Sequence, residues 1–238
     1  MGFPGKYDKT DNGRQLTSKL WRDFNPMALA GNPADGWMVL NDFHMLPDVL
    51  SYSLTAGGAE GTITLDGTAA NGVALLSAAN TAAGDGPNIE FLGMGALPAK
   101  NAVVAFEVRI KTATITDSHF VGMGGGSATA VIDTLPTDYA GFWVTDGGAD
   151  WTFGQQNGSA DTEVDVYTAV ANTYGKLGFR LHNGETEIYV NGEPYTHSLT
   201  AASHPSATDE IFPILACESE GAAAIMHVDW MAVGCLTA

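Results

Sequence analysis

The sequence predicts an all-β protein, a two-sheet antiparallel jelly-roll sandwich, and three observations support this class. Short apolar runs separated by Gly, Asn, Asp and Pro recur from residue 37 onward, as strands and tight turns require. No stretch of ten residues shows the 3.6-residue periodicity of a helix. Charged residues make up only 16% of the 238 residues, which suits short strands better than exposed helices.

Fourteen segments are expected to form strands, and so many short strands in one chain are typical of two antiparallel sheets packed face to face. The segments are 37–40, 51–54, 61–65, 73–77, 88–92, 102–111, 118–122, 140–144, 150–155, 163–166, 175–182, 185–190, 211–217 and 225–233.

Alternating side chains identify the faces of several strands. Val104, Phe106 and Val108 share one face of their strand, and Glu107 and Arg109 lie on the other. Segment 175–182 alternates in the same way. Segment 225–233 is apolar at both sets of positions, so we expect a central strand covered on both sides.

Two dipeptides predict tight turns. Asn183-Gly184 joins two predicted strands and is the strongest short-range signal of a β-hairpin. Asn191-Gly192 follows the second of these strands and predicts another turn.

The chain divides into an extended N-terminal arm, residues 1–36, and a sandwich domain, residues 37–238. The arm is rich in Gly and Pro and shows little periodicity, so it cannot bury enough apolar surface to order itself. We expect that either its own sandwich or a neighbouring subunit holds it in place.

Charge is unevenly distributed. Residues 1–22 contain five basic and two acidic residues, a net charge of +3. The remaining residues have a net charge of −20, which gives −17 for the whole chain. Such an acidic body repels nucleic acid and anionic lipid, and no run approaches the ~18 apolar residues of a membrane helix. We therefore expect no nucleic-acid or membrane partner. Cys217 and Cys235 have no metal-ligand spacing and are expected to be free, buried thiols.

Three segments resemble a known fold family. Residues 176–193, with the sequence Ile188-Tyr189-Val190-Asn191-Gly192 at their end, are similar to the central hairpin of concanavalin A-like, or LamG-like, sandwiches. Segments 105–110 and 228–230 resemble strands of tailed-phage virion proteins with this fold. The resemblance covers about residues 37–236 and favours a concanavalin A-like domain.

The resemblance implies a non-enzymatic phage virion structural protein, a capsid decoration or cement protein on the capsid surface, assembled in the host cytoplasm. The implied partners are the major capsid protein and neighbouring copies of the chain, as a homo-oligomer without cofactors. Aromatic and Arg side chains dominate interface energetics, so the arm is the expected contact. Its candidate residues are Lys6, Lys9, Arg14, Lys19, Trp21, Arg22 and Phe24.

A lectin-like tail or fibre module that binds glycan is the first alternative. Trp143 is predicted to point outward and is a candidate sugar contact. Related sandwiches often bind calcium, but no D-x-D-x-D-G loop is present, so no metal is predicted. The weak calcium candidates are Asp133, Asp138, Asp146 and Asp150.

A glucanase-like hydrolase is the second alternative. The sequence from Glu163 to Tyr167 resembles the E-x-D-x-E strand of sandwich-fold glucanases, which place two acidic groups on one face. Tyr167 stands where the second Glu is needed, or Thr168 if the strand contains a bulge. Because the second carboxyl group is missing from this register, we predict that the chain is not an enzyme.

Overall fold

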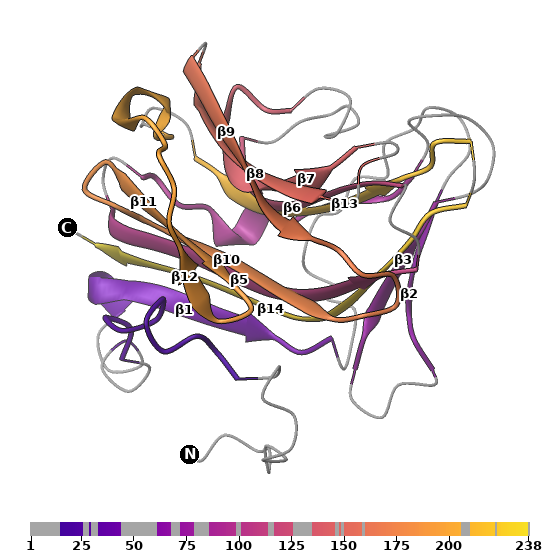
Figure 1. The fold of residues 1–238 in the computed structure, drawn as a ribbon. Helices are drawn as coiled ribbons and strands as arrows, with labels where there is room; N and C mark the ends of the chain where they lie inside the picture. Colours follow the sequence, from indigo (N-terminus) through magenta and orange to yellow (C-terminus); the bar gives the residue numbers. More distant parts are fainter. Residues whose placement is uncertain are drawn as a thin grey trace.

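Two antiparallel sheets face each other in the computed structural model, which confirms the predicted sandwich (Figure 1). The model describes residues 15–25, 29, 33–43, 61–67, 72–78, 86–98, 101–113, 117–125, 135–145, 148, 150–158, 160–205, 210–221 and 223–237.

One sheet has eight strands, in the order β12-β11-β10-β5-β14-β3-β2, with β1 also paired to β14. Their bounds are β1 Gly36–Asn41, β2 Thr62–Leu65, β3 Ala74–Ser77, β5 Asn101–Thr112, β10 Gly175–His182, β11 Glu185–Val190, β12 Glu193–Tyr195 and β14 Ile225–Thr237. As predicted, β14 is central, and it is buried on both faces over most of its length.

The other sheet has six strands, in the order β4-β13-β6-β7-β8-β9. They are β4 Asn88–Glu90, β6 Ser118–Gly124, β7 Asp138–Val144, β8 Asp150–Asn157, β9 Ala160–Thr168 and β13 Phe212–Glu218. Short 3-10 turns η2, η3 and η4 span Pro33–Asp35, Leu92–Met94 and Ala201–Ser203.

Most predicted strands are present to within a few residues of the expected ends. Segment 51–54 lies outside the described residues, and β12 was missed because three residues are too short for an alternation signal. The Asn183-Gly184 turn is confirmed, since both residues have positive φ, 49° and 77°, as a type I′ hairpin requires. Asn191-Gly192 has the same form, with φ of 51° and 87°.

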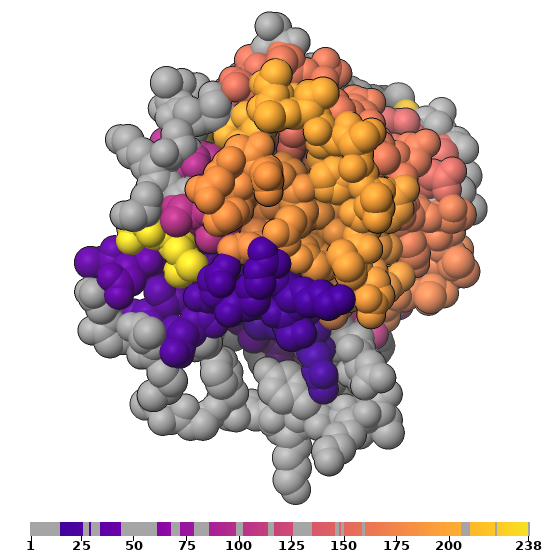
Figure 2. Space-filling view, turned by 60° about the vertical axis from the view of Figure 1, so that its left-hand side comes forward, coloured from indigo at the N-terminus to yellow at the C-terminus, as the bar shows by residue number. Residues whose placement is uncertain are grey.

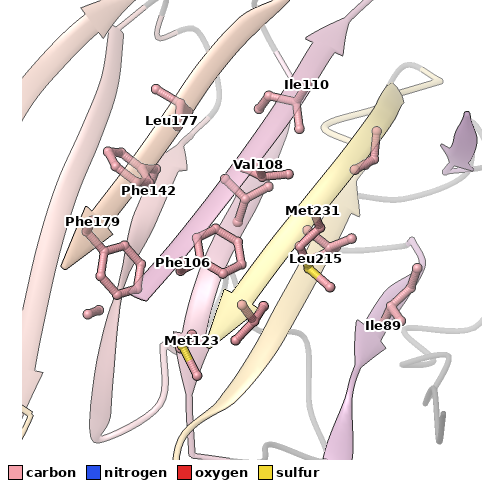
Figure 3. Close-up of a cluster of buried hydrophobic side chains, with 14 of the residues drawn as sticks. Ile89, Phe106, Val108, Ile110, Met123, Phe142, Leu177, Phe179, Leu215 and Met231 are labelled. Atoms are coloured by element: carbon pink, nitrogen blue, oxygen red, sulfur yellow. The ribbon is translucent and has the colours of Figure 1, made fainter. Parts of the chain in front are cut away.

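Aromatic side chains from both sheets meet in the core (Figure 3). Phe106 on β5 and Phe179 on β10 stack with ring centroids 5.4 Å apart. Phe142 on β7 and Phe153 on β8 reach the same cluster from the opposite sheet, where Phe153 lies 5.6 Å from Phe179. The inward positions predicted by alternation are therefore the ones that close the sandwich.

Residues 15–25, which we call the docking segment, pack on the outer face of the eight-stranded sheet (Figure 2). Two glycines make room for them. A Cβ on Gly178 would lie 2.7 Å from Leu20, and a Cβ on Gly234 would lie 2.6 Å from Phe24. The chain's own sandwich therefore holds this part of the predicted arm.

A buried carboxylate anchors the docking segment. Glu107 faces away from the core, as alternation predicts, yet it is fully buried because the segment covers it. The Thr17 amide donates to it at 3.0 Å and the Trp21 indole at 2.7 Å, and the Thr17 hydroxyl also donates. Lys176 lies 3.6 Å away. Several donors and one cation thus offset the cost of burying this charge.

The candidate partner-binding residues lie as follows. Trp21 and Phe24 are buried on the chain's own sheet. Arg22 donates to both carboxylate oxygens of Glu187, at 2.7 and 2.9 Å, and Lys19 lies 4.0 Å from Glu193. Lys6, Lys9 and Arg14 lie outside the described residues. The role of all seven candidate residues in binding a partner stays a prediction.

We predict that Trp21→Phe destabilises the protein by about 1.5–3 kcal/mol more than Trp230→Phe, as expected for a hydrogen bond to a charged group. Both indoles belong to the cluster under the docking segment, but Trp230 Nε1 has no hydrogen-bond partner among the described residues. Urea denaturation followed by circular dichroism measures the difference. Equal losses in the two variants would contradict the role given to Glu107.

Candidate functional site

Three carboxylates line the edge of the six-stranded sheet. Asp161, Glu163 and Asp165 alternate along β9, the edge strand, and all three are exposed. Residues two apart on a strand share a face, so these form one row, which we call the acidic row. Sequence analysis missed Asp161, although the D-x-E-x-D alternation is visible in the sequence.

Aromatic rings adjoin this row because the neighbouring strands carry glycine there. Glu163 pairs with Gly154 on β8, and Gly154 pairs with Gly141 on β7. A Cβ on Gly154 would lie 2.2 Å from the Trp143 ring and 3.1 Å from the Tyr139 hydroxyl. Both rings therefore cover the glycine backbone next to Glu163. Trp143 points outward as predicted, but only 8% of it is exposed.

Burial and charge shift two pKa values at this place. The pKa of Glu163 is raised, first because the neighbouring side chains remove solvent from it and then by the charges of Asp161 and Asp165. Burial, together with the charges of Glu163 and Asp161, also raises the pKa of Tyr139. Glu163 is thus the carboxyl group of the row that holds a proton more readily than usual.

Asp165 is held by neighbouring polar groups. Thr152 Oγ1 donates to its carboxylate at 2.8 Å, and the Tyr195 hydroxyl donates to its backbone carbonyl at 2.8 Å. A hydroxyl donor fixes the orientation of a carboxylate. The row therefore contains one carboxyl group with a raised pKa beside one that is oriented by a donor.

A β-bulge explains why the E-x-D-x-E comparison fails at its last position. The register between β8 and β9 shifts after Asp165, so that Tyr167 pairs with Trp151, a core residue. Tyr167 consequently packs against the core, and Thr168 is exposed and donates to Asp150 at 2.5 Å. The carboxylate row extends toward Asp161 instead.

The calcium candidates do not converge in the part of the chain that the structure describes. Asp138 pairs with Asn157 at one end of the β7–β8 hairpin, and Asp150 begins β8 at the other end. Asp133 and Asp146 lie outside the described residues.

Other expectations concern metals, thiols and membranes. Among the described residues, no group of three His, Cys, Asp or Glu side chains is placed to hold a metal ion. Cys217 and Cys235 are buried thiols that form no disulfide bond, as predicted. The described residues include no helix of the length and hydropathy needed to span a bilayer.

Comparison with known proteins finds similarity in structure but not in sequence. No protein-family model matches the chain, and no curated protein matches it. Solved structures do match, at 11–15% identity, which establishes the fold alone.

Three of the similar structures illustrate the match. A glycoside hydrolase family 16 protein of Bacteroides ovatus is 11% identical, with a TM-score of 0.60, over 82% of this chain and 99% of that one. The laminarinase catalytic domain of Thermotoga maritima is 15% identical, with a TM-score of 0.58, over 84% and 98%. A protein of unknown function from Shewanella oneidensis is 14% identical, with a TM-score of 0.62, over 99% and 97%.

These comparisons contradict two predictions. The chain was expected to be a non-enzymatic virion structural protein, but several of the similar structures are glucanases, and one is a laminarinase. The hairpin and long strands that supported a virion role are features of the sandwich itself, and a sandwich hosts many functions. The prediction that the chain is not an enzyme rested on Tyr167, whereas the carboxylates alternate from Asp161 to Asp165.

We predict that Gly154→Ala destabilises the protein by about 1–3 kcal/mol, the usual cost of overpacking, because its Cβ would collide with the Trp143 ring. Gly67→Ala is the matched control, since a Cβ at Gly67 meets nothing within 4 Å. Thermal denaturation of both variants measures the difference. A Gly154→Ala protein as stable as the control would contradict the close packing of Trp143 on β8.

Proposed function

We propose that this chain acts on a β-linked glucan, with Glu163 donating the proton that cleaves the glycosidic bond. One observation carries the proposal: a carboxyl group with a raised pKa lies between two other carboxylates, beside the glycine that the Trp143 and Tyr139 rings cover. Acidic pairs cleave glycosides. The two rings are only 8% and 1% exposed, so their part is to shield this place from water and not to stack on a sugar. The glucanases and laminarinases of the same sandwich fold support the substrate class.

The acidic row supplies the two carboxyl groups that this chemistry needs. Glu163 and Asp165 are two residues apart on β9, so their side chains lie on the same face of the strand. In the proposed reaction Glu163 protonates the leaving oxygen, and Asp165, oriented by Thr152, takes a proton from the water that attacks the anomeric carbon.

Glu163→Gln is expected to lower hydrolysis of laminarin and mixed-linkage glucan at least about 100-fold, since the amide cannot donate an acidic proton. Release of reducing ends measures the rate. Glu193→Gln is the control, because Glu193 is an exposed carboxylate on β12 in the other sheet. A wild-type protein that releases no reducing ends above buffer would overturn the proposed function.

The raised pKa of Glu163 also predicts how stability depends on pH. Ionised Glu163 is penalised in the folded state, so stability is highest below its unfolded pKa and declines as pH rises through the folded pKa. Glu163→Gln is therefore expected to raise the melting temperature at about pH 7 relative to the wild type and to have little effect at about pH 3. A lower melting temperature for the variant at neutral pH would contradict the direction of this shift.

A further inference from the structure

The docking segment contacts its sheet through a single row of side chains. Thr17, Leu20, Trp21 and Phe24 are buried, whereas the residues between them are exposed. This spacing of three and four residues places the four side chains on one face of a helical turn, and the Trp21 amide donates to the Thr17 carbonyl at 3.1 Å. Peptides that bind in the groove of a partner protein use the same spacing for their anchors. The segment therefore has the form of a bound peptide.

The sheet face beneath the segment is complementary to it in shape and in hydrogen bonding. Gly178 and Gly234 leave room for two of the four buried side chains. Glu107 accepts hydrogen bonds from the other two. Lys176 donates to the Gln15 carbonyl at 2.8 Å. Both the space and the hydrogen-bonding groups are thus built into strands β5, β10 and β14.

Charged side chains add to this complementarity. The segment carries three charged residues, and each lies within 4.0 Å of an opposite charge on the sheet. The pairs are Lys19 with Glu193, Arg22 with Glu187, and Asp23 with Arg180. Complementary charges direct association and disfavour other sequences. The sheet face is therefore specific for the sequence of this segment.

Docking also has a cost, which lies at Arg180. This side chain is 1% exposed, and its Nη2 donates to Asp23 of the segment. Its Nε and Nη1 have no hydrogen-bond partner among the described residues. A buried donor without an acceptor is unfavourable, and water hydrates it when the segment lifts. Glu107 and Lys176, which are also buried, gain solvation in the same way. The charged groups of this face thus suit both a docked and an undocked segment.

These contacts form equally well whether the segment and the sheet belong to one chain or to two. Pro33, where η2 begins, follows Asn25 by eight residues. Eight extended residues span about 26–29 Å, which is enough to reach an adjacent molecule. Exchange of an identical element between copies repeats the same contacts and is a low-cost route to dimers.

We propose that the outer face of the eight-stranded sheet binds the docking segment of a second copy of this chain. A second copy carries the four anchors and the three charges that the face is built to receive. The contact lies on the sheet opposite the one that carries the acidic row. It is therefore independent of hydrolysis at Glu163.

The test mixes two full-length variants that each lack one half of the contact. In Gly178→Leu the new side chain occupies the place of Leu20, so the face is blocked and the segment is intact. In the double variant Leu20→Ala with Trp21→Ala, the segment is defective and the face is intact. Analytical ultracentrifugation is expected to show monomers for each variant alone and, in an equal mixture, a species with twice the mass of one chain.

Hydrogen exchange read by mass spectrometry locates the contact in the mixture. The two variants differ in mass over residues 15–25, so their peptides are distinguished. The segment of Gly178→Leu is expected to exchange at least about tenfold more slowly in the mixture than in that variant alone, because docking protects its amides.

A second blocked face supplies the control. A Cβ on Gly234 would lie 2.6 Å from Phe24, so Gly234→Leu also blocks the face. An equal mixture of Gly178→Leu and Gly234→Leu has two intact segments and no open face, and it is expected to stay monomeric. Circular dichroism verifies folding, and Gly234→Leu takes the place of Gly178→Leu if the latter unfolds. The proposal is overturned if the mixture with the defective segment stays monomeric, or if it dimerises without slower exchange in residues 15–25.

Discussion

Three glycines in register across the six-stranded sheet are the constraint on which the candidate site depends. Gly122 pairs with Gly141, and Gly141 pairs with Gly154. A Cβ on any of them would lie within 2.7 Å of a neighbouring backbone or ring atom. Because these three glycines have no side chains, the Phe120 and Trp143 rings lie close against the sheet. The apolar surface that they form extends to Glu163 at the edge of the sheet. Partial removal of solvent at this place is the first cause of the raised pKa of Glu163.

The eight-stranded sheet uses glycine in a related way, on its outer face. Gly178 and Gly234 leave room for Leu20 and Phe24, so the docking segment approaches closely enough to bury Glu107. A buried carboxylate is costly unless donors surround it, and the segment supplies these donors itself. Packing and hydrogen bonding therefore depend on each other here, and the segment gains order that its own composition does not provide.

The strands and inward positions could be predicted because alternation is a local property of the chain. Residues such as Phe106, Phe142 and Phe179 occupy the core as that pattern indicates. The segment that covers the outward face of a strand comes from elsewhere in the chain, so the alternation within the strand does not predict it. The burial of Glu107 and Arg180 could therefore not be predicted from the sequence. The bulge after Asp165 also could not be predicted from the sequence. The comparison with glucanase strands was therefore extended to Tyr167, and Asp161 was not included.

The central claim is that Glu163 holds its proton more tightly than an ordinary carboxyl group, because of its neighbours. The most direct measurement is a carbon-13 NMR titration of the glutamate carboxyl groups, with Glu163 assigned by comparison with Glu163→Gln. The account predicts a pKa above the ordinary value of 4.5, moving down toward it in Asp161→Asn. A pKa at or below 4.5 in the wild type would contradict the account.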